Sequence, residues 1–159
     1  MDSIETFDPA ASRRPGGPGM HHVGFVVSSI DAGVRGFAQS IGALWDGKIV
    51  HDPIQSVRVT FLRSGLDTDP LVELVEPMGN ESPVIEFLRR GGGLHHICYE
   101  VDALEAQLVI SRSLGGLVVR NAVPAVAFGG RRIAWVYTKH RLLLEYLERE
   151  PARPIAVRT

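Results

Sequence analysis

The chain has 159 residues, of which 45% are hydrophobic and 22% are charged, and its formal net charge is -1. This length and composition suit one compact domain with a sizeable core, and the balanced charge argues against a nucleic-acid partner. The one cysteine excludes an internal disulfide and fits a reducing compartment, and no apolar run is long enough to span a bilayer. We therefore expect a cytoplasmic protein with no nucleic-acid partner and no membrane partner.

The N-terminal part of the chain predicts a tail followed by alternating elements. Residues 1–19 are rich in Pro, Gly, Ser and charge and contain no apolar core, which predicts a disordered tail. The periodicity of the next segments then predicts a strand, a helix and three further strands, at residues 21–28, 31–43, about 47–51, 56–64 and 70–77. Asp31 lies near the start of this helix and Gly42 near its end.

A short linker helix is expected at about 82–90. Ser82 is its predicted N-cap, Pro83 its first residue and Gly91 its stop signal. The same series of a strand, a helix and three strands is then expected again, at residues 95–101, 102–116, about 118–123, 130–139 and 141–148.

The helix of the second series and the end of the chain carry their own signals. Asp102 and Glu105 have the spacing of a capping box at the start of this helix, and Gly115 and Gly116 predict its end. Residues 149–159 predict a second loose tail.

The two series are copies of one unit. GMHHVGFVV at 19–27 resembles GLHHICYEV at 93–101, and LVELVE at 71–76 resembles LLEYLE at 143–148. His22 therefore matches His96, and Glu73 matches Glu145 at nearly the same offset. Two matches at opposite ends of a unit predict an internal duplication. We expect an α+β domain of two tandem β-α-β-β-β modules, at about 20–77 and 93–148, whose sheets form one cupped cavity.

The duplicated polar residues predict a metal site. Glu73 and Glu145 lie within otherwise apolar strands, where a carboxylate is unfavourable unless it is paired, hydrogen-bonded or bound to a metal. Neighbouring side chains of a strand point to opposite faces, so only one histidine of each His-His pair is expected to face a shared site. Two imidazoles and two carboxylates suit a divalent ion such as Zn, Co, Ni, Mn, Mg or Fe.

The duplicated unit resembles the vicinal oxygen chelate superfamily, also called the glyoxalase/bleomycin resistance/dioxygenase superfamily. The resemblance covers about residues 20–148, and VELVEPMGNESPVIEFL followed by GGGLHHICYEV looks most like the methylmalonyl-CoA epimerase branch. It implies a cupped, partly open mixed β-sheet barrel with flanking helices. It also implies that the metal ligands are His22, Glu73, His96 and Glu145.

The resemblance implies a reaction as well. In the superfamily, the metal commonly stabilises an enolate oxygen while a carboxylate moves a proton on the adjacent carbon. Glu145 is the expected base, and Glu73 is its symmetry-related alternative. The implied protein is a metal-dependent isomerase whose small-molecule substrate is an acyl-CoA, and it is expected to be a homodimer.

One departure from the epimerase pattern concerns the proton transfer. Some epimerases are thought to use a further carboxylate on the strand before the Glu73 strand. Here that strand reads SVRVTFLRS, with Arg58 and no acid. The second proton transfer would then use Glu73, a water or another residue, while Arg58 either holds a substrate anion or is a solvated strand residue.

Three alternatives remain open beside the isomerase. A glyoxalase I-like lyase would use the same metal set. An Fe(II) ring-cleaving or 2-oxo-acid oxygenase would use His22, His96 and Glu145 as a facial triad, although Glu73 would crowd its open positions. A non-catalytic, antibiotic-binding protein generally lacks the metal set.

Four nearby residues stay ambiguous in the sequence. His21 and His95 are expected to be structural or to support the ligands. Cys98 shares a face with His96, so it either borders the pocket or is a small core residue. Gly24, two residues after His22, either leaves room for a ligand or reflects tight packing.

Overall fold

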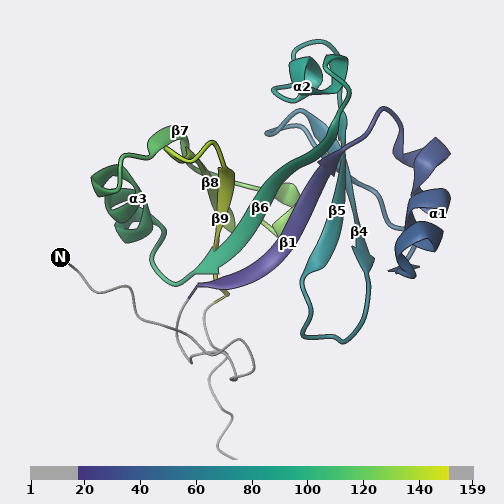
Figure 1. The fold of residues 1–159 in the computed structure, drawn as a ribbon, viewed down its shortest axis with the longest axis horizontal. Coiled ribbons are helices and arrows are strands. Elements are labelled where there is room, and N and C mark those ends of the chain that lie inside the picture. The colour runs from purple at the N-terminus through teal and green to yellow at the C-terminus, as the bar shows by residue number, and fades with distance from the viewer. Residues whose placement is uncertain (1–17, 151–159) are drawn as a thin grey trace, which may run out of the picture.

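The structure, a computed structural model, describes residues 18–150 and has an α+β fold (Figure 1). Within these residues, nine strands form one mixed sheet in the order β2-β4-β5-β1-β6-β9-β8-β7, with β3 paired to β4. Over the same range the sheet does not close into a complete barrel. The expectation of an α+β fold with a partly open, mixed sheet is therefore confirmed.

The elements follow the duplicated order that the sequence predicts, except for one short additional strand, β2, in the first module. The first module contains β1 (Gly19–Val26), α1 (Ile30–Ile41), β2 (Leu44–Trp45), β3 (Val50–Asp52), β4 (Val57–Arg63) and β5 (Leu71–Pro77). The linker helix is α2 (Ile85–Arg89). The second module contains β6 (Gly93–Val101), α3 (Leu104–Ser113), β7 (Leu117–Pro124), the 3-10 turn η1 (Val126–Phe128), β8 (Arg132–Tyr137) and β9 (Leu143–Glu148). The turn η1 was not expected from the sequence.

Strands β1 and β6 join the two modules at the middle of the sheet. They pair antiparallel with each other, while β1 pairs parallel with β5 and β6 pairs parallel with β9. In this register Gly24 lies opposite Glu73 on one side and His96 on the other, and Cys98 lies opposite Glu145. The duplicated residues of both modules therefore meet along the central strands.

The long helices cover the outer faces of the two half-sheets, β1–β5 and β6–β9. Figure 1 shows α1 on the outer side of the first half-sheet and α3 on the outer side of the second. In α1, Ile30, Val34 and Ala38 recur every four residues and pack against Leu62 and Leu74. Helix α3 packs in the same way, through a cluster of Val101, Leu104, Leu108, Ala134, Val136 and Tyr146. The inner faces remain available for the cavity.

The ends of α1 agree with the sequence pattern. The hydroxyl of Ser29 accepts a hydrogen bond from the Ala32 N–H at the start of the helix. Gly42 ends the helix with φ 65°, in the left-handed region that favours glycine.

The predicted caps of α2 and α3 are wrong. Helix α2 begins at Ile85, and Ser82 does not cap it with its side chain. Helix α3 has no side-chain cap either, because the two acids expected to form the capping box bind arginines. Asp102 accepts a hydrogen bond from Arg149, and Glu105 accepts two from Arg132. At the start of α3, tertiary ion pairs therefore replace the predicted capping box.

The predicted tails lie mostly outside the described residues, which exclude 1–17 and 151–159. At the inner boundaries, Gly19 already belongs to β1, and the Arg149 N–H donates to the Val101 carbonyl. Within residues 18–150, no helix has the length and apolar character needed to cross a membrane.

Candidate metal centre

The structure brings His22, Glu73, His96 and Glu145 together in one buried cluster, which we call the four-donor centre. The four side chains come from β1, β5, β6 and β9, respectively. The Nε2 atom of His22 lies 3.2 Å from Glu73 Oε2, 3.1 Å from Glu145 Oε2 and 3.1 Å from His96 Nε2. The Nε2 atom of His96 lies 3.3 Å from Glu73 Oε2 and 3.6 Å from Glu145 Oε2. Each module thus contributes one imidazole and one carboxylate.

His22, Glu73 and His96 form a group of buried donor atoms that could hold a metal ion. Their separations are 3.1–3.3 Å, and Glu145 Oε2 lies 3.1 and 3.6 Å from the two imidazoles. These five separations are close to the roughly 3.3–3.6 Å between ligands that lie 2.0–2.2 Å from a tetrahedral metal. Both carboxylates are buried, and Glu145 Oε2 makes no hydrogen bond of acceptable geometry within residues 18–150, although His22 Nε2 lies 3.1 Å away. Two buried carboxylates are unfavourable unless positive charge compensates them, and either a protonated His22 or a bound metal ion would supply it. The residues present therefore fit a metal ion, with His22, Glu73, His96 and Glu145 as the side chains that could hold it.

Gly24 makes space for one of these donors. A Cβ atom at this position would overlap the imidazole of His96, with the ring carbon Cε1 nearest to it. Gly24 pairs directly with His96 in the β1–β6 ladder, so the close approach of backbone and ring follows from the register. Of the two interpretations left open by the sequence, the structure supports tight packing: Gly24 packs against the ring of His96, one of the four donors.

The first histidine of each pair contacts the second. The Nδ1 atoms of His21 and His22 are 2.8 Å apart, and those of His95 and His96 are 3.0 Å apart. A histidine that uses Nε2 towards a metal carries its proton on Nδ1 and needs an acceptor for it. His21 and His95 therefore lie where they can accept that hydrogen bond and fix the orientation of His22 and His96.

The buried charges shift the pKa values of the centre. Burial disfavours the imidazolium form of His22, but the charge of Glu73 and contacts with both carboxylates raise its pKa to about 10. Burial would raise the pKa of Glu73, yet His22 and His96 hold it below its ordinary value. Burial and the adjacent His96 lower the pKa of His95 to about 4, which keeps its imidazole neutral and able to accept a hydrogen bond.

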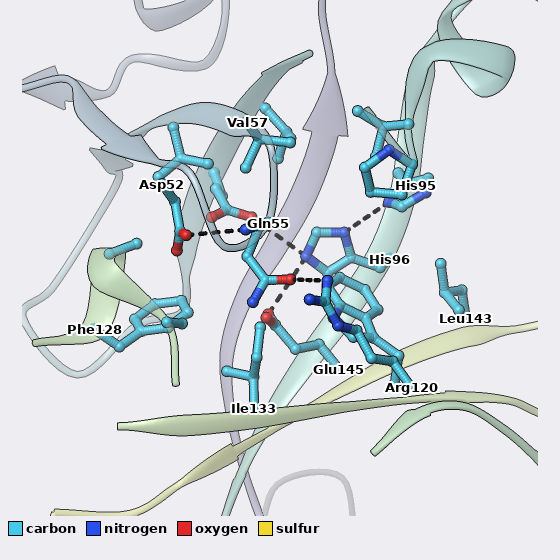
Figure 2. A pocket seen from close by; sticks show the side chains of 18 of the residues that line it. Asp52, Gln55, Val57, His95, His96, Arg120, Phe128, Ile133, Leu143 and Glu145 are labelled. Carbon is cyan, nitrogen blue, oxygen red and sulfur yellow. Dashed lines mark hydrogen bonds and ion pairs between the residues drawn. The ribbon is translucent and has the colours of Figure 1, made fainter. Parts of the chain in front are cut away.

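A cavity of about 440 Å³ opens onto the centre. Glu73, His96 and Glu145 line it together with mainly apolar side chains from both half-sheets. Figure 2 shows His96 and Glu145 facing the cavity, with Phe128 on the opposite side. Phe128 stacks on His22, and the ring of Trp135 meets that of His96 edge-on. The centre therefore lies at the wall of a largely apolar pocket of a size that suits a small-molecule group.

Three polar residues of this cavity were missed in the sequence: Asp52, Gln55 and Arg120. Asp52 Oδ1 accepts from the N–H groups of Ile54 and Gln55, and its Oδ2 accepts from the Val126 N–H of the other module. Arg120 donates to Gln55 Oε1. None of the three polar cavity residues has a counterpart in the repeat, so the duplication gave no signal for them.

Two other residues singled out in the sequence, Cys98 and Arg58, do not line the cavity. Cys98 is fully buried in an apolar cluster and is not among the cavity-lining residues, and burial together with Glu145 raises its pKa. Arg58 does not reach the cavity either, because it forms ion pairs of 3.0 Å with Glu76 and 2.9 Å with Asp31. The cavity therefore gives no support to the hypothesis that Arg58 holds a substrate anion.

Known proteins share this sequence pattern. The family model described as "Glyoxalase/Bleomycin resistance protein/Dioxygenase superfamily" matches residues 21–135. An ethylmalonyl-CoA/methylmalonyl-CoA epimerase of Cereibacter sphaeroides is 28% identical over 122 residues, which cover 76% of this chain and 88% of that protein.

Solved structures share the fold. Methylmalonyl-CoA epimerase of Mycobacterium tuberculosis has a TM-score of 0.72 and 25% identity, over 84% of this chain and 89% of that chain. A variant of the Streptomyces coelicolor methylmalonyl-CoA epimerase, in complex with 2-nitronate-propionyl-CoA, has a TM-score of 0.69 and 25% identity. The match covers 83% of this chain and 97% of that chain. The chain thus belongs to the glyoxalase/bleomycin resistance protein/dioxygenase superfamily, and its relatives include methylmalonyl-CoA epimerases.

Proposed function

We propose that this protein is a metal-dependent epimerase that moves a proton on the carbon next to an acyl-thioester carbonyl, with methylmalonyl-CoA as the first substrate to test. The observation that carries the proposal is the four-donor centre, in which two buried imidazoles and two buried carboxylates converge at the wall of an apolar cavity. The similarity to methylmalonyl-CoA epimerases supports the substrate class.

The reaction divides between a metal and the two carboxylates. A divalent ion bound by His22, Glu73, His96 and Glu145 would supply a Lewis acid that polarises the thioester carbonyl. Glu145 then takes the proton from the carbon between the thioester and the carboxylate of the substrate. Glu145 is suited to this role because its carboxylate is buried and lines the cavity, where it can reach the substrate.

Epimerisation also requires a proton donor on the opposite face of the carbon. Glu73 lines the same cavity but comes from the other half-sheet. Asp52 is the further acid of this cavity, but both of its oxygens already accept hydrogen bonds from backbone N–H groups. We therefore assign the second proton transfer to Glu73, which must first take up a proton, because His22 and His96 favour its carboxylate form.

The test is incubation of the metal-loaded protein with (2R)- or (2S)-methylmalonyl-CoA in D2O, followed by mass spectrometry. Deuterium should enter at C2, and both epimers should form. The Glu145→Gln variant should lose this exchange by roughly 10²–10⁴-fold, because that is the usual contribution of a general base. Glu148→Gln is the matched control, since Glu148 lies on the same strand but pairs with Arg132 outside the cavity.

Other outcomes would identify another member of the superfamily. Conversion of the hemithioacetal of methylglyoxal and glutathione, without exchange on methylmalonyl-CoA, would favour a lyase. Consumption of O2 with an aromatic compound or a 2-oxo acid would favour an oxygenase. Tight binding of a small molecule without turnover would contradict the proposal of an enzyme. A cytoplasmic location and a homodimeric state remain predictions.

A further inference from the structure

Arg120 is the one lysine or arginine among the described residues that line the cavity. It lies on β7, in the second module, and is partly buried. Figure 2 shows its guanidinium beside Gln55, in the same pocket as Glu145 and His96. A cation at this place faces the same space that the substrate of the four-donor centre would occupy.

The partners of Arg120 leave its charge uncompensated. Its Nη1 donates to Gln55 Oε1 at 2.6 Å, and its Nη2 donates to the Ile54 carbonyl at 3.1 Å. Both acceptors are neutral, and within residues 18–150 Arg120 forms no ion pair with a carboxylate, whereas Arg58, Arg131 and Arg132 each do. A guanidinium has five N–H donors, so several of them stay available for a ligand.

The backbone of β7 is irregular on both sides of Arg120. Arg120 pairs with Trp135, and the register shifts both between Val118 and Arg120 and between Arg120 and Val123. Bulges of this kind redirect a side chain and are common next to active sites. Trp135 in turn contacts the ring of His96. The irregular strand β7 thus brings Arg120 to the pocket wall, with β8 between β7 and the nearest donor strand, β9.

The charge of the pocket explains what Arg120 would bind. Two glutamates neutralise a divalent ion, so a substrate carboxylate brings an extra negative charge into an apolar site, where it is unfavourable unless paired. The planar guanidinium matches a carboxylate through two parallel hydrogen bonds. Gln55 holds Arg120 in place without satisfying its charge, and its own Nε2 donates to the Pro124 carbonyl at 3.4 Å.

We propose that Arg120 is a specificity-determining residue that binds the free carboxylate of the acyl group, so that the protein selects acyl thioesters with an anionic acyl part over neutral ones. This inference rests on the proposed function for the acyl-thioester substrate. It assigns to Arg120 the anion recognition that the sequence suggested for Arg58.

The test measures ligand binding to the metal-loaded protein by isothermal titration calorimetry. The ligands are racemic methylmalonyl-CoA and propionyl-CoA, which differ by one carboxylate, and the N-acetylcysteamine thioesters of the same acyl groups, which lack the phosphates. The Arg120→Gln variant should bind both methylmalonyl thioesters roughly 10- to 100-fold more weakly, as expected for loss of a charge-assisted hydrogen bond. Its binding of both propionyl thioesters should change by less than about threefold.

The matched control is Arg112→Gln, because Arg112 is exposed on α3 and is not among the cavity-lining residues. This control should bind every ligand like the wild type, and equal melting temperatures should show that both variants fold. Unchanged binding of the methylmalonyl thioesters by Arg120→Gln would overturn the inference. Equal weakening of both CoA esters, with no effect on the N-acetylcysteamine esters, would overturn it too, because Arg120 would then bind a phosphate.

Binding is measured apart from turnover, so the two proposals fail separately. Wild-type protein that binds methylmalonyl thioesters through Arg120 but exchanges no proton at C2 would contradict the proposed epimerase and leave the anion site standing. Normal exchange in wild type, together with unchanged methylmalonyl binding in Arg120→Gln, would overturn only the role of Arg120.

Discussion

Glu73 and Glu145 show how single residues reveal the centre. Both are buried on apolar strands, where an ionised carboxylate is unfavourable without a compensating partner. Each lies within 3.2 Å of the same His22 nitrogen, so the two carboxylates share one imidazole. With an ion bound, they would instead be ligands of a common cation, and His22 would be neutral.

Gly24 gives a direct test of this geometry. Gly24→Ala should displace the imidazole of His96, because the added methyl group overlaps the ring. We expect metal affinity to fall by roughly 10- to 100-fold, as for other changes that misorient a ligand. Gly33→Ala is the control, since a Cβ there meets nothing within 4 Å. Competition with a chromogenic chelator measures the affinity, and equal affinities in the two variants would contradict the placement of His96.

The raised pKa of His22 predicts how metal binding depends on pH. Without metal, the imidazole keeps its proton up to about pH 10, whereas a metal binds only the neutral form. Binding should therefore release a proton, and the apparent affinity should rise by about tenfold per pH unit between pH 7 and pH 9. Calorimetry in buffers of different ionisation enthalpy measures this release. A pH-independent affinity without proton release would show that His22 is not a ligand.

The sequence could predict the four donors but not the residues around them. His22 and His96, like Glu73 and Glu145, stand at matching positions of the two copies, and this repetition separates them from isolated strand histidines. Arg120 and Asp52 have no such counterpart, and the contacts by which they join the two modules link residues 65–74 positions apart. Nor does one sequence reveal the bulges beside Arg120, which depend on the pairing with β8.

At the level of elements, the segment after β3 and the end of β7 connect the two half-sheets across the cavity. Asp52 accepts the Val126 N–H, Gln55 donates to Pro124, and Arg120 contacts both Gln55 and Ile54. These polar contacts bridge apolar walls, and Asp52 is almost fully buried. The connection therefore holds the two half-sheets together at the pocket that Asp52, Gln55 and Arg120 line.

Asp52→Asn tests this connection. In the variant, an NH2 group would replace one carboxylate oxygen that now accepts a hydrogen bond from a backbone N–H. That buried N–H would lose its acceptor. We expect the free energy of unfolding to fall by about 1–3 kcal/mol. The melting temperature should fall by roughly 2–4 °C for each kcal/mol in a chain of this size. The control Asp67→Asn changes a side chain that is 97% exposed. Similar melting temperatures for both variants, measured by circular dichroism, would contradict the role of Asp52.

The ends of the helices show where local sequence signals are sufficient to predict a boundary. The end of α1 at Gly42 follows from local backbone preference, so the sequence predicts it. The start of α3 does not, because Asp102 and Glu105 bind arginines that come from the β8–β9 region of the fold. Local pattern thus predicted the order of the elements, whereas long-range ion pairs decided the details of their ends.

At the level of the whole molecule, the sheet leaves β7 as an edge strand within the described residues. Leu117 and Val119 on this strand are more than half exposed, at 67% and 58%. Unpaired apolar edges favour association with another chain. The expected homodimer should therefore have about twice the chain mass of 17.4 kDa in light scattering after size-exclusion chromatography.

Leu117→Lys should shift this equilibrium towards the monomer, because the new charge would be buried at the paired edge. Leu66→Lys is the control, since Leu66 is 71% exposed in the segment between β4 and β5, away from β7. A wild-type protein of monomeric mass, or equal masses for both variants, would contradict dimerisation through β7.

We propose that the two modules bind one metal ion between them. Anomalous X-ray diffraction from crystals of the protein loaded with Co²⁺ would locate this ion. We predict one anomalous peak per chain, about 2.0–2.2 Å from Nε2 of His22 and His96 and from one carboxylate oxygen each of Glu73 and Glu145. No peak at this position, or a peak bound by other side chains, would contradict it.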